Sequence, residues 1–100
     1  MMNLDKSDSH DFERLSVAVL VPCYNEELTV AKVVSDFKDL LPGCTIYVYD
    51  NNSQDNTIRE AKNAGAVVRI HKMAGKGNVV RQMFSDVESD VYVLVDGDDT

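Results

Sequence analysis

Cysteine, basic residues and long apolar runs are all scarce in this chain of 100 residues. Its two cysteines, Cys23 and Cys44, are too few for a disulfide framework or a zinc site, so we expect reduced thiols in a cytoplasmic protein. Ten Lys and Arg residues are outnumbered by 17 Asp and Glu residues, and the formal net charge of −7 argues against nucleic acid as a partner. No stretch approaches the roughly 20 consecutive apolar residues of a membrane-spanning helix.

The composition is that of a single small domain with a short tail. Residues 1–15 are polar and lack the apolar segment of a signal peptide, so we expect them to form a flexible N-terminal tail. Residues 16–100 contain no internal repeat and no low-complexity linker. A composition of 44% hydrophobic and 27% charged residues is ordinary for a soluble globular domain.

Short apolar segments alternate with amphipathic ones along the chain. The segment 16–22 is continuously apolar, which indicates a strand buried on both faces, as in a parallel sheet. Strict alternation with short connections predicts right-handed βαβ units, an α/β fold and a parallel sheet. The expected strands are 16–22, 44–49, 66–71 and 90–95, and the expected helices are 26–41, 56–64 and a segment that ends near 87.

The first predicted helix has the strongest pattern. Asn25 is its expected N-cap, and Pro42-Gly43 is expected to end it. Its apolar residues recur at helical spacing and should face the core: Val30, Val33, Val34, Phe37, Leu40 and Leu41.

Polar residues follow every predicted strand, in the segments 22–27, 50–55, 71–78 and 96–100. Ligands of open α/β sheets bind at the carboxyl ends of the strands, so we expect these four loops to form one site. The last loop places Asp96, Asp98 and Asp99 on five residues, where like charges repel unless a cation lies between them. Carboxylate ligands suit Mg²⁺ or Mn²⁺, with substrate phosphates completing the coordination. The sequence thus predicts a divalent-metal site for a phosphorylated ligand.

Four motifs in order resemble those of family 2 glycosyltransferases, which have the Rossmann-like GT-A fold. They are Val21-Pro22-Cys23-Tyr24-Asn25-Glu26-Glu27, the loop 50–57, Gly75-Lys76-Gly77-Asn78 and Asp96-Gly97-Asp98. The resemblance spans residues 16–100 and is greatest to polyprenyl-phosphate and dolichyl-phosphate sugar transferases. It implies that the chain is the N-terminal, nucleotide-sugar-binding part of a longer domain, and we expect this part alone to be inactive.

The resemblance also implies roles for individual residues. Asp50 would accept a hydrogen bond from the base, Lys76 would lie near phosphate or ribose oxygens, and Asp98 would bind the cation. Family members carry an apolar residue at the position of Asp99, and some carry a metal-binding Gln at the position of Thr100. This chain departs from the family pattern at both positions. The implied nucleotide-sugar-binding residues are Pro22, Tyr24, Asn25, Glu26, Asp50, Lys76 and Asp96, and the implied metal ligands are Asp96 and Asp98.

The function implied is glycosyl transfer from a UDP- or GDP-sugar, dependent on Mg²⁺ or Mn²⁺, to a polyprenyl-phosphate acceptor. A phosphate monoester is largely dianionic at neutral pH, so such an acceptor needs no strong base, and none is assigned within these residues. Any base and any membrane association are expected to come from polypeptide beyond Thr100, with the protein at the cytoplasmic face of a membrane.

Two other functions fit parts of the sequence. Asp96-Gly97-Asp98-Asp99-Thr100 also fits haloacid-dehalogenase-type phosphatases, in which Asp96 would be the nucleophile and Asp98 the general acid. The second alternative is a module that binds a nucleotide without catalysing a reaction. Some candidate residues also have structural explanations: Pro22 as a strand terminator, Asn25 and Glu26 in a helix cap and first turn, Asp50 or Asp55 as a helix cap, and Lys76 as a solvated lysine.

Overall fold

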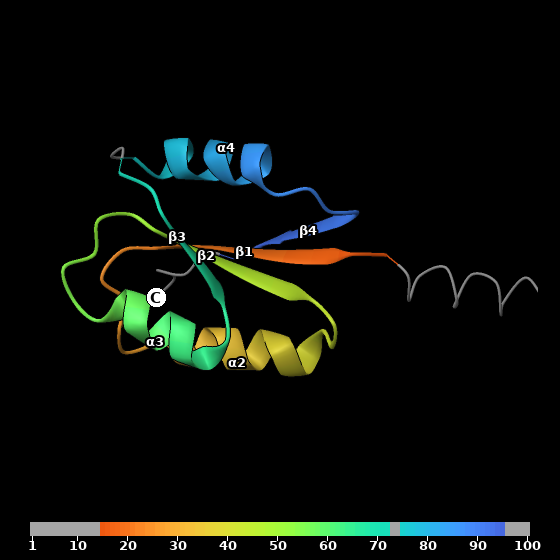
Figure 1. The fold of residues 1–100 in the computed structure, drawn as a ribbon, viewed down its shortest axis with the longest axis horizontal. Helices are drawn as coiled ribbons and strands as arrows, with labels where there is room; N and C mark the ends of the chain where they lie inside the picture. Colours follow the sequence, from red (N-terminus) through yellow and green to blue (C-terminus); the bar gives the residue numbers. More distant parts are fainter. Residues whose placement is uncertain (1–14, 73–74, 96–100) are drawn as a thin grey trace, which may run out of the picture.

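The computed structural model describes residues 15–72 and 75–95. They form a four-stranded parallel sheet with helices on both faces (Figure 1). The predicted α/β fold is therefore confirmed. In chain order the elements are β1 (Val17–Cys23), α2 (Val30–Leu40), β2 (Thr45–Asp50), α3 (Thr57–Ala64), β3 (Val67–Ile70), α4 (Lys76–Asp86) and β4 (Val91–Leu94).

The strand order in the sheet is β3-β2-β1-β4, and every pairing is parallel. The chain moves outward from β1 to β3 through α2 and α3 on one face, and then returns through α4 on the other face to pair β4 with β1 (Figure 1). The chain thus reverses its direction across the sheet between β1 and β4. Ligands of open α/β sheets bind at such a switch point, beyond the carboxyl ends of the strands.

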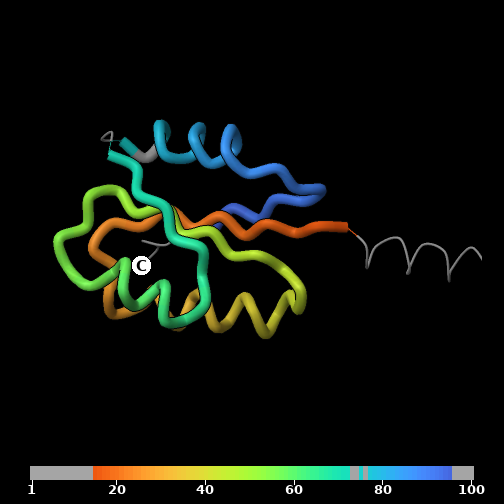
Figure 2. The backbone as a smooth tube through the Cα atoms, viewed as in Figure 1, coloured from red at the N-terminus to blue at the C-terminus, as the bar shows by residue number. Residues whose placement is uncertain are grey.

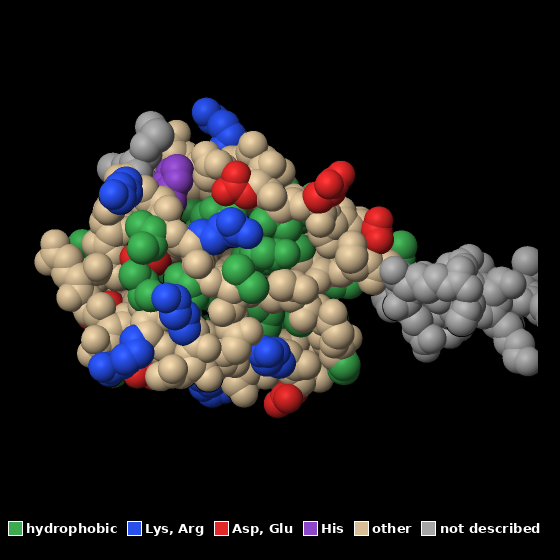
Figure 3. Space-filling model, in the orientation of Figure 1, with side chains coloured by type: hydrophobic (Ala, Val, Ile, Leu, Met, Phe, Trp, Pro, Cys, Tyr) green, Lys and Arg blue, Asp and Glu red, His purple; other side chains and the backbone are tan. Residues whose placement is uncertain are grey.

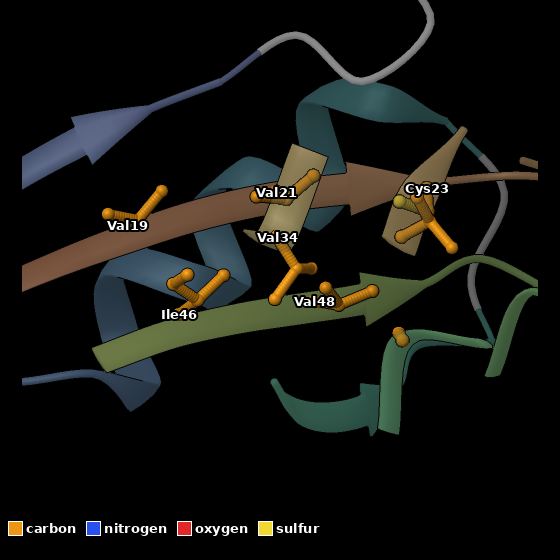
Figure 4. Packing of buried hydrophobic residues seen from close by; sticks show 8 residues of the cluster. Val19, Val21, Cys23, Val34, Ile46 and Val48 are labelled. Atoms are coloured by element: carbon orange, nitrogen blue, oxygen red, sulfur yellow. The ribbon is translucent and has the colours of Figure 1, made fainter. Parts of the chain in front are cut away.

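The larger part of the core lies between the sheet and the two helices α2 and α3. Val34 of α2 packs among the side chains of β1 and β2 (Figure 4). Because alternate residues of a strand point to opposite faces, the remaining residues of β1 face α4. The buried residues of the first cluster include Val19, Val21, Val34, Ile46 and Val48, and those of the second include Ala18, Leu20, Tyr49, Val79 and Met83. Both faces of β1 are buried, as its continuous apolarity predicts.

Helix α2 is shorter than predicted. The backbone N–H groups of Thr29 and Val30 donate to the carbonyl of Glu26 in a turn, and the helix begins only at Val30. Thr29 occupies the N-cap position, so the prediction of Asn25 as N-cap is wrong. Leu40, expected to face the core, is largely exposed. None of the described helices is long and apolar enough to cross a membrane.

Pro22 lies inside β1 and does not terminate it, because the strand continues to Cys23. The pairing with β4 ends at Leu20, so at Pro22 the strand is paired with β2 alone. Proline lacks an N–H donor and is tolerated in a sheet where one side of the strand is unpaired. The structure therefore places Pro22 where the carboxyl end of β1 emerges from the sheet.

A buried tyrosine connects the sheet to α4. The Tyr49 hydroxyl donates to Asp86 Oδ2 at 2.9 Å, and Gln82 Nε2 donates to Asp86 Oδ1 at 2.7 Å. Burial, together with the hydrogen bond to Asp86, raises the pKa of Tyr49 well above its ordinary value. The folded protein therefore favours the protonated phenol more strongly than the unfolded chain does.

This linkage predicts an alkaline loss of stability. The contribution of Tyr49 is present below its unfolded pKa of about 10 and is lost as the pH rises beyond it, because the unfolded chain then releases the proton first. Tyr49→Phe should lower the free energy of unfolding by about 1 kcal/mol at neutral pH and should flatten the alkaline decline in chemical denaturation experiments. Tyr24→Phe, which changes an exposed ring, is the control. An undiminished alkaline decline in Tyr49→Phe would contradict the assignment.

Candidate functional site

The carboxyl ends of the strands form one rim of the sheet, from which the loops after β1 and β2 project side by side (Figure 2). Cys23 is paired with Asp50, and Asp50 with Ile70. Backbone bonds extend this order one residue further, because the N–H of Asn51 donates to the carbonyl of Cys23 at 2.8 Å and the N–H of His71 to that of Asp50 at 2.9 Å. The first residues of the loops therefore inherit the order of the sheet.

The loop after β1 and the loop after β2 bind each other reciprocally. The backbone N–H of Asn25 donates to Ser53 Oγ at 2.7 Å, and the backbone N–H of Gln54 donates to Asn25 Oδ1 at 2.8 Å. Asn25 has φ 53, in the left-handed region that Asn tolerates better than most residues. Asn25 thus joins two loops instead of capping α2.

Glu26 and Glu27 continue this contact. The N–H of Glu26 donates to Thr57 Oγ1 at 2.7 Å, and that of Glu27 donates to Asp55 Oδ2 at 3.2 Å. In return, the N–H of Asn56 donates to Glu27 Oε1 at 2.8 Å. N–H groups that precede a helix have no acceptor within it. Here each loop supplies side-chain acceptors for the main-chain N–H groups of the other.

Asp50 is the described residue whose side chain most clearly needs a further partner. It ends β2 and is 1% exposed. Its Oδ2 accepts the backbone N–H of Ser53 at 2.9 Å, whereas its Oδ1 is buried and accepts no hydrogen bond. An unsatisfied buried oxygen costs free energy, and an N–H group of a ligand would remove that cost. The predicted contact between Asp50 and a base therefore has the acceptor that it requires.

His71 is a second residue with an unsatisfied buried side-chain atom, and it was not among the predicted site residues. It follows β3 directly, at the same rim, and its buried Nε2 has no hydrogen-bond partner. Its position could have indicated a site residue. His71 directly follows β3, and β3 is paired with β2, the strand that ends in Asp50.

The other predicted nucleotide-binding residues differ in exposure. Tyr24 is 58% exposed, Asn25 is exposed and Glu26 is partly buried, whereas Pro22 is buried within the strand. The side chain of Cys23 is buried as well. The structure therefore brings the predicted residues of the first loop close to Asp50 through the strand pairing of Cys23 with Asp50.

The third and fourth motifs are only partly within the described residues. Lys76 is the first residue of α4, after Gly75 with φ 105, and its side chain is not among those described. Asp96, Asp98, Asp99 and Thr100 lie outside the described residues. Within residues 15–72 and 75–95, no group of three or more His, Cys, Asp and Glu side chains could hold a metal ion. The metal prediction therefore depends on Asp96 and Asp98, which are not described.

A hollow of about 560 Å³ lies against the two joined loops. Asp50 is not among its lining residues, so it is distinct from the position that the buried carboxylate marks. Leu28 is the apolar residue of its lining and is 91% exposed. The lining residues are Asn25, Glu26, Glu27, Leu28, Thr29, Gln54 and Asp55.

Asp55 holds the second loop in shape. Its Oδ1 accepts hydrogen bonds from the backbone N–H and the hydroxyl of Thr57, the first residue of α3, and its Oδ2 accepts that of Glu27. Burial acts to raise the pKa of Asp55, but these hydrogen bonds outweigh it and hold the pKa below its ordinary value. The carboxylate therefore stabilises the fold above the ordinary pKa of an aspartate, and this contribution is lost as the pH falls through the lowered pKa.

The paired loops give a testable prediction. Asp55→Ala should lower the melting temperature at neutral pH, because three donors lose a charged acceptor, and the difference from wild type should shrink toward acidic pH. Differential scanning calorimetry over a pH series measures both effects. Asp39→Ala, at an exposed position of α2, should change the melting temperature little. Equal effects of the two substitutions would show that the bonds of Asp55 are not stabilising.

Comparisons with known proteins agree with this architecture. Residues 18–100 match the family model described as glycosyl transferase family 2. The chain is similar to protein RfbJ of Shigella flexneri, with 54% identity over 89 residues that cover 89% of this chain and 69% of RfbJ. It is 30% identical over 91 residues to the dolichol-phosphate mannosyltransferase of Pyrococcus furiosus, covering 84% of this chain and 26% of that protein.

A solved structure is similar in fold. The glucosyl-3-phosphoglycerate synthase of Mycobacterium tuberculosis, in complex with Mn²⁺, UDP and glucosyl-3-phosphoglycerate, has a TM-score of 0.76 and 26% sequence identity. The match covers 86% of this chain and 34% of the solved chain. This chain thus spans about a quarter to a third of the mannosyltransferase and the synthase. The family model matches most residues of this chain, and the match to RfbJ covers more than two thirds of the length of RfbJ. The chain therefore belongs to glycosyl transferase family 2.

Proposed function

We propose that this chain carries the donor-nucleotide site of an enzyme that transfers a sugar from a nucleoside diphosphate to a polyprenyl-phosphate acceptor, with Mg²⁺ or Mn²⁺ as cofactor. Membership of glycosyl transferase family 2 supports glycosyl transfer over the phosphatase alternative. The observation that carries the proposal is the buried Asp50 Oδ1, which accepts no hydrogen bond at the carboxyl end of β2.

The base would satisfy Asp50. Uracil presents one ring N–H between two carbonyl oxygens, and guanine presents a ring N–H beside an amino group, so both offer a donor to a carboxylate. UDP is the nucleotide in the complex of the Mycobacterium tuberculosis synthase, which favours a UDP-sugar as the donor over a GDP-sugar. Cytosine and adenine lack a ring N–H on their pairing edges and would offer Asp50 Oδ1 an exocyclic amino group instead.

The first loop would form the base and ribose end of the site. Tyr24 exposes a ring on which a base could stack, at the rim beside Asp50. Asn25 and Glu26 are already fixed by the second loop through Ser53 and Thr57. Because these backbone positions are held before the nucleotide arrives, little conformational entropy would be lost on binding. Pro22 would shape the start of this loop from within β1.

The diphosphate would lie toward β4, at the switch point between β1 and β4. The backbone N–H of Val95 donates to the carbonyl of Leu20 at 2.9 Å, so the pairing with β1 reaches the last described residue, and Asp96 follows directly. We assign the cation to Asp96 and Asp98, because carboxylate oxygens are the ligands that Mg²⁺ and Mn²⁺ prefer. When bound, it would neutralise the charge that develops on the departing diphosphate. Lys76 would add a positive charge on the phosphate or ribose side.

The acceptor is proposed to be a lipid phosphate. The name of the Pyrococcus furiosus relative indicates a dolichol phosphate, and that of the Mycobacterium tuberculosis enzyme indicates a phosphoglycerate, so both acceptors carry a phosphate. A phosphate monoester is largely dianionic at neutral pH and is itself a competent nucleophile. This agrees with the lack of an assigned base among the residues of the chain.

Isothermal titration with UDP in the presence of Mn²⁺ tests the base contact. In Asp50→Asn, either orientation of the amide turns an NH₂ group toward a donor, the N–H of Ser53 or that of the base. UDP affinity should therefore fall about tenfold or more. Asp39→Asn is the matched control, with the same change on an exposed face of α2. Unchanged UDP affinity in a folded Asp50→Asn protein would refute the role of Asp50.

A second titration tests the metal ligand. Asp98→Asn should abolish the difference in UDP affinity between buffers with Mn²⁺ and with a chelator, because the cation loses a charged ligand. Glu88→Gln, which removes one charge from an exposed position before β4, should keep that difference. UDP binding that is equally strong without a divalent cation in the wild type would count against metal-dependent transfer altogether.

A further inference from the structure

One edge of the sheet differs in charge from the rest of the molecule. Strand β3 is the outermost strand on its side and pairs with β2 alone. Residues 57–72, which span α3, β3 and the two residues after β3, contain four basic residues and one acid, a net charge of +3 in a chain of net charge −7. The four basic residues, Arg59, Lys62, Arg69 and Lys72, are all exposed.

These basic residues are largely without counter-charges. The guanidinium of Arg59 lies 3.6 Å from the carboxylate of Glu60, with both side chains substantially exposed. Within residues 15–72 and 75–95, Lys62, Arg69 and Lys72 form no salt bridge. Their charge is therefore available to an anionic partner.

Apolar side chains lie among them. Val67 is 40% exposed and Ile70 is 60% exposed, at the two ends of β3. On the face drawn in Figure 3, Lys and Arg side chains are spread around hydrophobic surface, and several of the acidic side chains lie toward the margins. We call this surface the basic edge: Arg59, Lys62, Arg69 and Lys72, with Val67 and Ile70 between them.

We propose that the basic edge docks the protein on an anionic lipid bilayer. A bilayer surface with anionic headgroups attracts clustered Lys and Arg residues, and exposed aliphatic side chains can enter its interface. Another β-strand is a poorer partner, because charged residues on an edge strand oppose strand pairing. The choice of a bilayer over other anionic partners rests on the proposed function, since a polyprenyl-phosphate acceptor is held in a membrane.

The position of the basic edge determines how the docked protein would be oriented on the bilayer. Lys72 lies two residues beyond β3, at the rim that carries Asp50, and its carbonyl accepts a hydrogen bond from Asn52 Nδ2 at 2.9 Å. The basic edge therefore begins on α3 and reaches the loops of the candidate site. The negative charge on the remainder of the chain would be repelled by the same bilayer, so a single face is selected for docking.

Sedimentation with vesicles tests the proposal. The probes are vesicles of equal parts phosphatidylcholine and phosphatidylglycerol, and vesicles of phosphatidylcholine alone. The wild type should bind the anionic vesicles, should be released by high salt, and should bind neutral vesicles weakly. Arg59→Glu combined with Lys62→Glu, the basic-edge variant, changes two exposed positions of α3 away from the rim and should reduce binding to anionic vesicles about tenfold or more. Ile70→Ser should also weaken binding to the anionic vesicles at low salt, because it removes one of the aliphatic side chains that would enter the bilayer interface.

The matched control is Lys32→Glu combined with Arg81→Glu, which makes the same change in net charge on α2 and α4. It should retain binding within about twofold, because those positions lie outside the basic edge. Equal losses of vesicle binding in the two double variants would mean that binding depends on net charge alone, and would overturn the proposal. Wild-type binding that is absent, or unchanged in the basic-edge variant, would overturn it as well, as would a dimer in the wild type that only the basic-edge variant loses.

A parallel titration with UDP and Mn²⁺ separates this proposal from the donor-site proposal. The basic-edge variant should keep the UDP affinity of the wild type, which also confirms that it is folded. Vesicle binding without any UDP binding in the wild type would refute the nucleotide site and leave the docking surface standing. UDP binding without vesicle binding would refute the docking surface alone.

Discussion

The parallel pairing of β1 with both β2 and β4 is the constraint on which the rest of this structure depends. It buries both faces of β1 and places the carboxyl ends of the strands on one rim. Because Cys23 is paired with Asp50, the two loops that follow begin side by side and can exchange hydrogen bonds. A shift of this pairing by one residue would turn the apolar residues of β1 toward the wrong helices and would separate the loops.

The architecture could be predicted from the sequence because its signals are local. A continuous apolar strand and the regular spacing around Val30 and Val34 determine their elements without reference to distant residues. The start of α2 could not be predicted in this way. Asn25 is a good N-cap by composition, but Ser53, 28 residues later, offers its backbone a competing partner. Local propensity cannot reveal such a contact, because it exists only after the sheet has formed.

Only some residues of the candidate site could be predicted from the sequence. Asp50 was predicted as a binding residue from the resemblance of its loop to a family motif, and the structure adds a separate observation, an unsatisfied buried oxygen on its side chain. His71 was missed because a single histidine after a strand is usually structural, and only the burial of its Nε2 marks it as unusual. The roles of Asp96 and Asp98 remain predictions from charge spacing and resemblance.

The bonds between the two loops have a consequence for protein engineering. Ser53, Asp55 and Thr57 supply side-chain acceptors for three main-chain N–H groups of the first loop, and any amino acid except proline carries such an N–H group. Tyr24 and Leu28 are highly exposed in that first loop. Mutant libraries that randomise these two positions should therefore preserve the scaffold while diversifying exposed side chains beside the candidate site, whereas libraries at Ser53 or Thr57 should contain mostly unstable clones.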